Sequence, residues 1–329
     1  MPINPYENVD WQNIIRVPSC SHAHCESQEQ FDIFNAEGGL KHFAISNYYP
    51  SVPCYPLSSV YTVPSDTISS PNAEHHYIFF SGSINPRFHV NGLGSFFESG
   101  SARGHEPMGC NGDDVSSVVQ NILSRLQYAD GGGVTINHPG WSLLTEKQIK
   151  KLLDIDDRVL GIEIYSTDQI VFDPYFNDNM RLWDSALMSG RRCWAFCVSD
   201  HAGQVYENWN GRNILLVSEF TERECLKAYR EGRFYGRIKN SNLNFLSISL
   251  SGNTYSVETE NADYIKIIID GEQQQITGNS ASVEIPNGAT YVRSEGWTDD
   301  DAIFSNPIMF KGKKRTGMTS TMRMLLYSE

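Results

Sequence analysis

Two histidines near the N-terminus, His22 and His24, have a spacing that suits metal coordination. The run before them, residues 14–17, is predicted to be a strand that ends near Cys20. Because side chains alternate along an extended chain, both imidazoles would leave this strand end on the same side. Histidine nitrogens are common metal ligands. The pair alone is a weak signal, because many histidines at this spacing are surface residues.

Several later strand-like runs end in the same residue types. Hydrolytic sites with two metals need several His and carboxylate ligands around ions that lie about 3.5–4 Å apart. The carboxyl ends of neighbouring strands could bring such a set together on one rim. The candidate metal ligands are His22, His24, Glu74, His89, His138, Asp200 and His201.

These candidates also have structural explanations. His138 could be a turn histidine held by the proline after it, and Asp200 could cap the segment that follows. His76 continues into an apolar run and is expected in the core. Glu163 lies inside a predicted strand, where a carboxylate needs a polar partner, so a supporting role is expected rather than ligation. His105 is a weaker ligand candidate than His89.

Strands and helices are expected to alternate over most of the chain. Valine, isoleucine and leucine recur at helical spacing from Val115 to Leu126, and Thr145 with Gln148 forms a capping box. Glycines end several of these helices before the next apolar run. The alternation predicts a parallel sheet with helices outside it, and in such folds the strand carboxyl ends carry the chemistry.

The pattern changes near residue 237. Short alternating runs separated by Ser-Gly-Asn, Asp-Gly and Asn-Gly turns replace the helices between residues 243 and 310. They predict a small β-sandwich. We therefore expect two domains, a hydrolase-like domain over residues 1–236 and an accessory β-sandwich domain over residues 237–329.

Composition limits the partners. The chain has 26 Lys and Arg against 39 Asp and Glu, a formal net charge of −13, which argues against nucleic acid and anionic membranes. No run of about 18 apolar residues and no secretory signal is visible. Seven irregularly spaced cysteines predict free thiols in a reducing compartment, so a cytoplasmic location is expected. A periplasmic protein whose leader had been removed from the sequence would also lack a visible signal.

As a set, these motifs resemble the PHP family, named for polymerase and histidinol phosphatase, over residues 14–236. The resemblance rests on the His22/His24 pair, on Glu74 in Asn-Ala-Glu, on His89 before Gly-Leu, on His138 in a His-Pro motif and on Ser-Asp-His at residues 199–201. It implies a distorted seven-stranded β/α barrel, similar to a TIM barrel, with metal ions at the strand carboxyl ends. It also implies a first ion bound by His22, His24, Glu74 and Asp200, and a second bound by Glu74, His89 and His138.

The chain departs from the family at the third metal site. Family members have Ile-Thr-Asp-His after the second strand, whereas this chain has Asn47 and Tyr48 at the last two positions. Where the family has an Asp or His shortly after the paired histidines, this chain offers Gln28, Glu29 or Gln30. The sequence therefore predicts two divalent ions (Zn, Mn or Fe) and does not support a third.

The preferred function is a metal-dependent phosphoesterase that acts on a small phosphorylated metabolite through an activated water. His201 would donate a proton to the leaving group, with Tyr48 as a competitor for that role. Arg103 or Arg212 would contact phosphate. Two alternatives stay open: a degenerate PHP domain that binds a ligand or partner without turnover, and a two-metal amide or ester hydrolase. Oligomeric state is not predicted.

Overall fold

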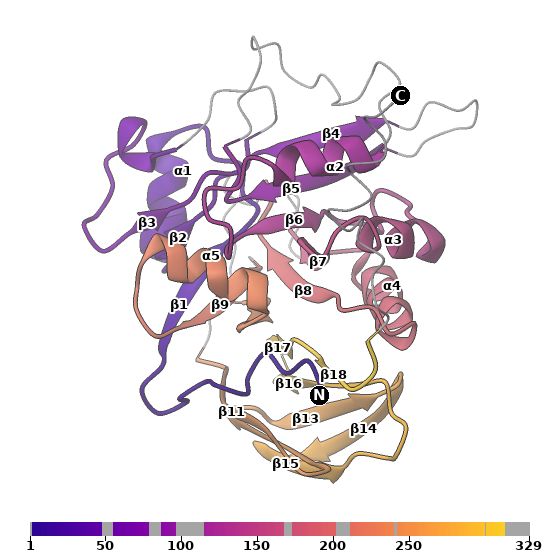
Figure 1. The fold of residues 1–329 in the computed structure, drawn as a ribbon. Helices are drawn as coiled ribbons and strands as arrows, with labels where there is room; N and C mark the ends of the chain where they lie inside the picture. Colours follow the sequence, from indigo (N-terminus) through magenta and orange to yellow (C-terminus); the bar gives the residue numbers. More distant parts are fainter. Residues whose placement is uncertain are drawn as a thin grey trace, which may run out of the picture.

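The computed structural model describes residues 2–47, 55–78, 87–96, 115–167, 173–201, 211–239, 242–299 and 301–312. Figure 1 shows strands at the centre, helices on their flanks and a layer of C-terminal strands beneath. The helices of the described residues are α1 (Gln28–Asp32), α2 (Val115–Leu123), α3 (Glu146–Leu153), α4 (Phe176–Met188) and α5 (Glu222–Glu231), with a π-helical turn at Ile33–Glu37 and a 3-10 turn at Leu57–Ser59. Among these residues, no helix is long and apolar enough to span a bilayer.

The candidate ligands lie within or shortly after strands of the first ten. These strands are β1 (Ile15–Cys20), β2 (His42–Phe43), β3 (Ile68–Ser69), β4 (Glu74–Ile78), β5 (Arg87–Leu93), β6 (Gly133–Ile136), β7 (Val159–Ser166), β8 (Trp194–Val198), β9 (Arg212–Val217) and β10 (Phe234–Arg237). Strands β4 to β8 form one sheet in sequence order, and a second sheet runs β10-β9-β1-β2-β3. The fold is therefore mixed α/β.

The strand directions differ from the parallel arrangement that the sequence predicts. Strands β6, β7 and β8 are parallel, as are β1, β2 and β3, but β5 is antiparallel to both β4 and β6, and β9 is antiparallel to β1 and β10. Only residues 79–86 separate β4 from β5, whereas a parallel crossover needs a dozen residues or more. A closed seven-stranded β/α barrel is accordingly not shown.

The two sheets meet where β1 and β8 end. The backbone of Asp200, just after β8, accepts a hydrogen bond from His24 N (2.9 Å) and donates one to His22 O (3.0 Å). Glu74 N, at the start of β4, donates to Ser46 O (3.0 Å). Four of the candidate ligands are thus positioned by main-chain bonds that bridge the sheets.

The helices use the signals that their sequences predict. Thr145 and Gln148 form a complete capping box before α3. Thr221 caps α5, and Gly232 ends it with a φ of 77°, a left-handed conformation that glycine adopts without strain. The residues of α2 at helical spacing, from Val115 to Leu123, are buried against the β4–β8 sheet and its neighbours.

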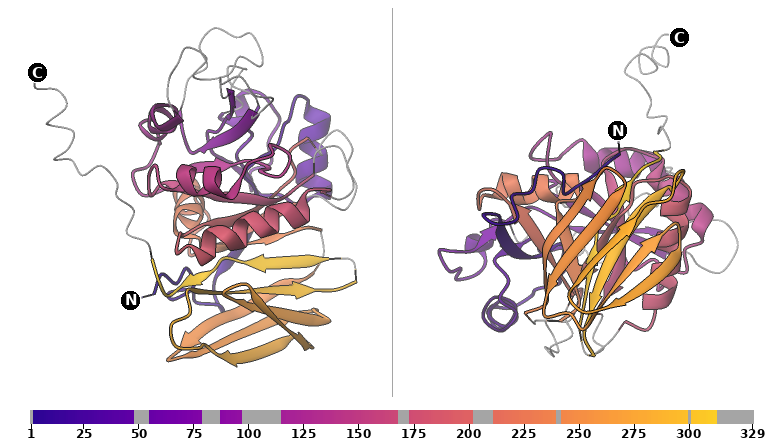
Figure 2. Two further views of the ribbon diagram at one scale, coloured as in Figure 1. Left: turned by 90° about the vertical axis from the view of Figure 1, so that its right-hand side faces the viewer. Right: turned by 90° about the horizontal axis from the view of Figure 1, so that it is seen from below.

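The remaining strands form two layers, seen below the rest of the molecule in Figure 2. They are β11 (Asn244–Ser251), β12 (Thr254–Glu260), β13 (Tyr264–Ile269), β14 (Glu272–Thr277), β15 (Ser280–Glu284), β16 (Tyr291–Trp297), β17 (Ala302–Ser305) and β18 (Ile308–Met309). Strands β11, β12 and β15 form one sheet, and an apolar core that includes Phe245, Val257 and Ile265 separates it from the other.

The second of these layers is continuous with the N-terminal part of the chain. Strand β17 pairs with β10, and β10 pairs with β9, so the order β14-β13-β16-β17-β10-β9-β1 is unbroken. The boundary expected at residues 236 and 237 falls inside β10. The division into two domains stays a prediction.

Candidate metal centre

His22 and His24 project into one buried cluster. Their Nε2 atoms lie 3.3 Å apart, and both side chains are almost fully buried. Asp200 Oδ1 lies 3.2 Å from His22 Nε2 and 3.3 Å from His24 Nε2. Glu74 Oε2 lies 3.1 Å from His24 Nε2. Four donor atoms of the types that bind divalent ions therefore converge on one point.

Glu163 on β7 lies behind His22. Its Oε1 accepts a hydrogen bond from His22 Nδ1 (2.7 Å), and its Oε2 accepts one from the backbone N of His138 (2.8 Å). A proton on Nδ1 leaves the lone pair of His22 on Nε2, the atom that faces the cluster. These two bonds are the polar partners that a carboxylate inside a strand requires.

Glu74 connects this group to a second one. Its Oε1 accepts from His89 Nδ1 (2.8 Å) and lies 3.3 Å from His138 Nε2. Asn137 Nδ2 donates to the same oxygen at 3.0 Å. The carboxylate of Glu74 thus lies between His22 and His24 on one side and His89 and His138 on the other.

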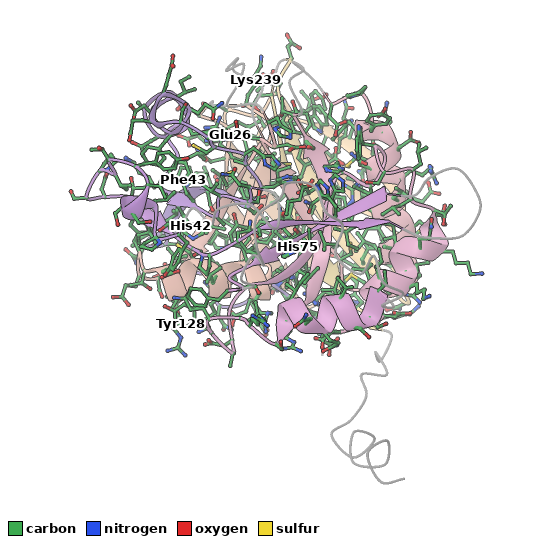
Figure 3. The ribbon with its side chains drawn as sticks, turned by 90° about the horizontal axis from the view of Figure 1, so that it is seen from above. Glu26, His42, Phe43, His75, Tyr128 and Lys239 are labelled. Atoms are coloured by element: carbon green, nitrogen blue, oxygen red, sulfur yellow. The ribbon has the colours of Figure 1, made fainter. Side chains whose placement is uncertain are left out.

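His76 belongs to the cluster, and its expected place in the core is wrong. Its Nε2 lies 3.7 Å from Glu74 Oε2, and its ring stacks on that of His89 with a centroid distance of 3.8 Å. Glu74 and His76 are two residues apart on β4, so alternation places them on the same face. His75, which Figure 3 labels, is the buried residue of the opposite face. The signal was present in the spacing, but the apolar residues that follow obscured it.

Two residues of the cluster have backbone angles that are uncommon outside glycine. His138 has a φ of 24° and Asp200 a φ of 48°. Asp200 is held there by its backbone bonds to His22 and His24. Such conformations persist where the surroundings enforce them, and they are frequent at functional sites.

The cluster is strongly coupled electrostatically. Burial opposes the charged form of each group, yet Glu163, Asp200 and Glu74 outweigh burial and hold the pKa of His22 well above its usual value. The surrounding histidines, in turn, hold the pKa of Glu74 well below its usual range despite burial. By contrast, burial lowers the pKa of His89 to about 4, which leaves its ring neutral and able to bind a metal.

The donor set fits divalent ions. Nitrogen and carboxylate atoms that lie within 4.8 Å of one another form three groups: His22, His24 and Glu74; His24, Asp200 and His201; and Glu74, His76 and His89. Two buried carboxylates need positive charge nearby, which either protonated imidazoles or metal ions can supply. Mixed His and carboxylate ligands are those that Zn, Mn and Fe share.

The structure brings together all seven candidate ligands, and of the weaker candidates it describes only Glu29 and Arg212, which lie elsewhere. The ring of His201 stacks on His24 at 4.0 Å, and its Nε2 lies 3.9 Å from Asp200 Oδ1. Glu29 is exposed on α1. Arg212 is buried on β9, where its guanidinium donates to Gly38 O. Tyr48, Arg103 and His105 lie outside the described residues.

A pocket opens beside the cluster. Its lining includes five ligand candidates, namely Glu74, His89, His138, Asp200 and His201, and it also includes Trp141, Pro174 and Tyr175, which we call the apolar wall. The described residues between β2 and β4 do not line it.

No family model and no curated protein sequence matches this chain. One solved structure that is similar is a two-domain protein from Bacteroides vulgatus, described as containing a predicted PHP-like metal-dependent phosphoesterase. It is 10% identical, with a TM-score of 0.45, over 94% of this chain and 90% of that chain. A similarity this weak carries no weight for the fold or the function.

Proposed function

We propose that this protein is a metal-dependent hydrolase of the PHP type, and specifically a phosphoesterase that acts on a small phosphorylated metabolite. The observation that carries the proposal is the convergence of His22, His24, Asp200 and Glu74 in a buried site, where the Nε2 atoms of the two histidines lie 3.3 Å apart and 3.1–3.5 Å from the carboxylate oxygens. Side chains of this kind repel one another or compete for protons unless a cation lies among them.

The proposal assigns two ions to the cluster. His22, His24, Glu74 and Asp200 would hold one, and Glu74, His89, His138 and His76 the other. Divalent ions bound there would supply Lewis-acid binding of phosphate oxygens and would lower the pKa of a bound water. Among the described lining residues of the pocket there is no Lys or Arg, so the ions would provide most of the charge that attracts phosphate.

The remaining roles belong to residues around the ligands. Glu163 would fix the tautomer of His22, and Asn137 would orient Glu74. His201 lines the pocket next to Asp200 and would donate a proton to the leaving group. Tyr48, the competitor for that role, lies outside the described residues. The net charge of −13 supports a small-molecule substrate over nucleic acid or an anionic membrane.

The test combines metal analysis with a substrate panel. Purified protein is analysed for bound Zn, Mn and Fe, and is then assayed on phosphomonoesters and phosphodiesters with each ion. His22→Ala and Asp200→Asn should each lower turnover by on the order of 10³-fold or more, because each removes a ligand. Asparagine tolerates a positive φ, so Asp200→Asn preserves the backbone at this site. Lys41→Ala, an exposed substitution, is the control.

The possible outcomes separate the proposal from its alternatives. Two ions per chain and turnover of a phosphoester would support it, and three ions would assign a further one to His24, Asp200 and His201. Fewer than one ion per chain, or phosphoester turnover that His22→Ala leaves unchanged, would contradict the proposed function. Full loading without phosphoester turnover would favour an amide or ester hydrolase, or a ligand-binding protein.

A further inference from the structure

We propose that Trp141, together with Pro174 and Tyr175, binds a flat aromatic group of the substrate. This inference rests on the proposed function and deepens it: the substrate class is a phosphate ester that carries an aromatic ring. The phosphate would lie at the ligand candidates that line the pocket, and the ring would lie against Trp141, Pro174 and Tyr175.

Trp141 lies directly beside the second ligand group. Its ring centroid is 4.9 Å from that of His138 and 5.4 Å from that of His89, yet the residue is 42% exposed. A tryptophan presents a large apolar face, and aromatic rings stack favourably on it. An exposed tryptophan that lines a pocket next to reactive groups is therefore well placed to bind a ring.

The turn that carries Trp141 is held rigidly. Ser142 N donates to His138 O (3.1 Å), and Leu144 N donates to Pro139 O (3.0 Å). Gly140 N donates to the Oδ1 atom of Asn179 at 2.8 Å. A binding surface held in place in this way loses little entropy when a ligand docks.

The two parts of the apolar wall are tied to each other. A Cβ atom on Gly140 would lie 2.8 Å from Tyr175 Cβ, so only glycine allows the Trp141 turn to pack this closely. Asn179, which accepts from Gly140, also donates to Asp173 Oδ2 (3.0 Å). Asp173 Oδ1 in turn accepts from Tyr175 N (2.8 Å). Buried polar bonds therefore fix the spacing between Trp141 and Tyr175.

The charge of the pocket also favours a ring. The carboxylate of Asp173, which lines the pocket, already accepts three N–H hydrogen bonds, from Ser166, Tyr175 and Asn179. The lining described here has neither Lys nor Arg, so this wall offers no partner for a second phosphate or a carboxylate. Apolar contact and stacking are what it can provide.

The experiment compares two ligands that differ only in the ring. Binding of phenylphosphonate and methylphosphonate to metal-loaded protein is measured by calorimetry, for the wild type and three variants. The wild type should prefer phenylphosphonate by roughly ten-fold, and Trp141→Ala should reduce this preference to roughly two-fold. Trp141→Phe should keep most of it. Leu143→Ala, in the same turn and 68% exposed, should keep all of it.

Failure of this inference can be told apart from failure of the proposed function. Equal binding of the two phosphonates, or a preference that Trp141→Ala leaves intact, would overturn the aromatic wall while phosphoester turnover stands. If neither phosphonate binds to protein that carries its ions, both the aromatic wall and the phosphoesterase proposal are overturned.

Discussion

His22 Nδ1 lies 2.7 Å from Glu163 Oε1, although the two residues are 141 positions apart in the chain. Glu163 is inside β7, between β6 and β8 in the β4–β8 sheet, whereas His22 follows β1 in the other sheet. The same carboxylate accepts the backbone N–H of His138. One buried glutamate therefore fixes a candidate ligand in each of the two groups.

Glu163→Gln should weaken metal binding by roughly 10–100-fold without unfolding the protein, as substitutions behind metal-bound histidines commonly do. A glutamine has one oxygen and cannot accept from both His22 and His138. The measurement is competition with a chelator for Zn²⁺, with circular dichroism to check the fold. Glu272→Gln, on the exposed face of β14, is the matched control. Unchanged affinity in Glu163→Gln would show that His22 needs no such support.

His76→Ala should lower the number of bound ions by one, because the potential ligand atoms of His76, Glu74 and His89 lie within 4.8 Å of one another. His75→Ala should leave the number unchanged, since His75 faces the opposite side of β4. It should lower the melting temperature, because it opens a cavity in the core. Metal analysis and thermal unfolding of the two neighbouring variants test this directly. Equal ion counts in both would remove His76 from the ligand set.

Much of the cluster was predictable because its members obey local rules. His22, His24, His138 and Asp200 each follow a short apolar run, and strand ends are where polar side chains of different strands can meet. Helices α3 and α5 could also be predicted from the sequence, because Thr145 and Thr221 are capping residues whose effect is local.

The arrangement of the strands was not predictable in the same way. Strand β10 contains Tyr235 and Gly236 and lacks a clear alternating pattern, yet it joins β9 to β17. Its pairing depends on β17, roughly 70 residues later, which no local window contains. The two-residue period of β4 indicates that His76 shares a face with Glu74, but the apolar residues that follow it are equally typical of a core strand.

The stability of the protein should depend on His42 in mild acid. Burial lowers its pKa to about 3, and its ring nitrogens lie 2.7 Å from Ser19 Oγ and 2.9 Å from Ser70 Oγ. Above the ordinary pKa of about 6.5 the ring is neutral in both states. As the pH falls from there towards about 3, only the unfolded chain gains the proton, so stability falls by up to about 1.4 kcal/mol per pH unit.

His42→Gln isolates this effect. The variant should be less stable than the wild type near neutral pH, but its stability should fall less between pH 7.5 and pH 5. At the acidic end of this range, its unfolding should take up about one proton fewer than that of the wild type. Urea unfolding at several pH values measures both slopes, and titration of the metal cluster cancels because it is common to the two proteins. Parallel curves would contradict the assignment.

The contact between α4 and β16 should be worth far more than an exposed ion pair. Arg293, almost fully buried, makes two hydrogen bonds to Asp184, from Nε (2.9 Å) and Nη2 (3.0 Å), and also contacts Glu295. Asp184→Ala removes one of the two carboxylates that pair with the buried guanidinium of Arg293 and leaves only Glu295. We therefore expect a loss of about 3 kcal/mol in the free energy of unfolding. The exposed pair Lys41–Asp66 is the contrast, and Asp66→Ala should lower the free energy of unfolding far less, because water screens this pair. Denaturant unfolding of both variants decides the matter, because similar losses would mean that the C-terminal strands are not anchored through Arg293.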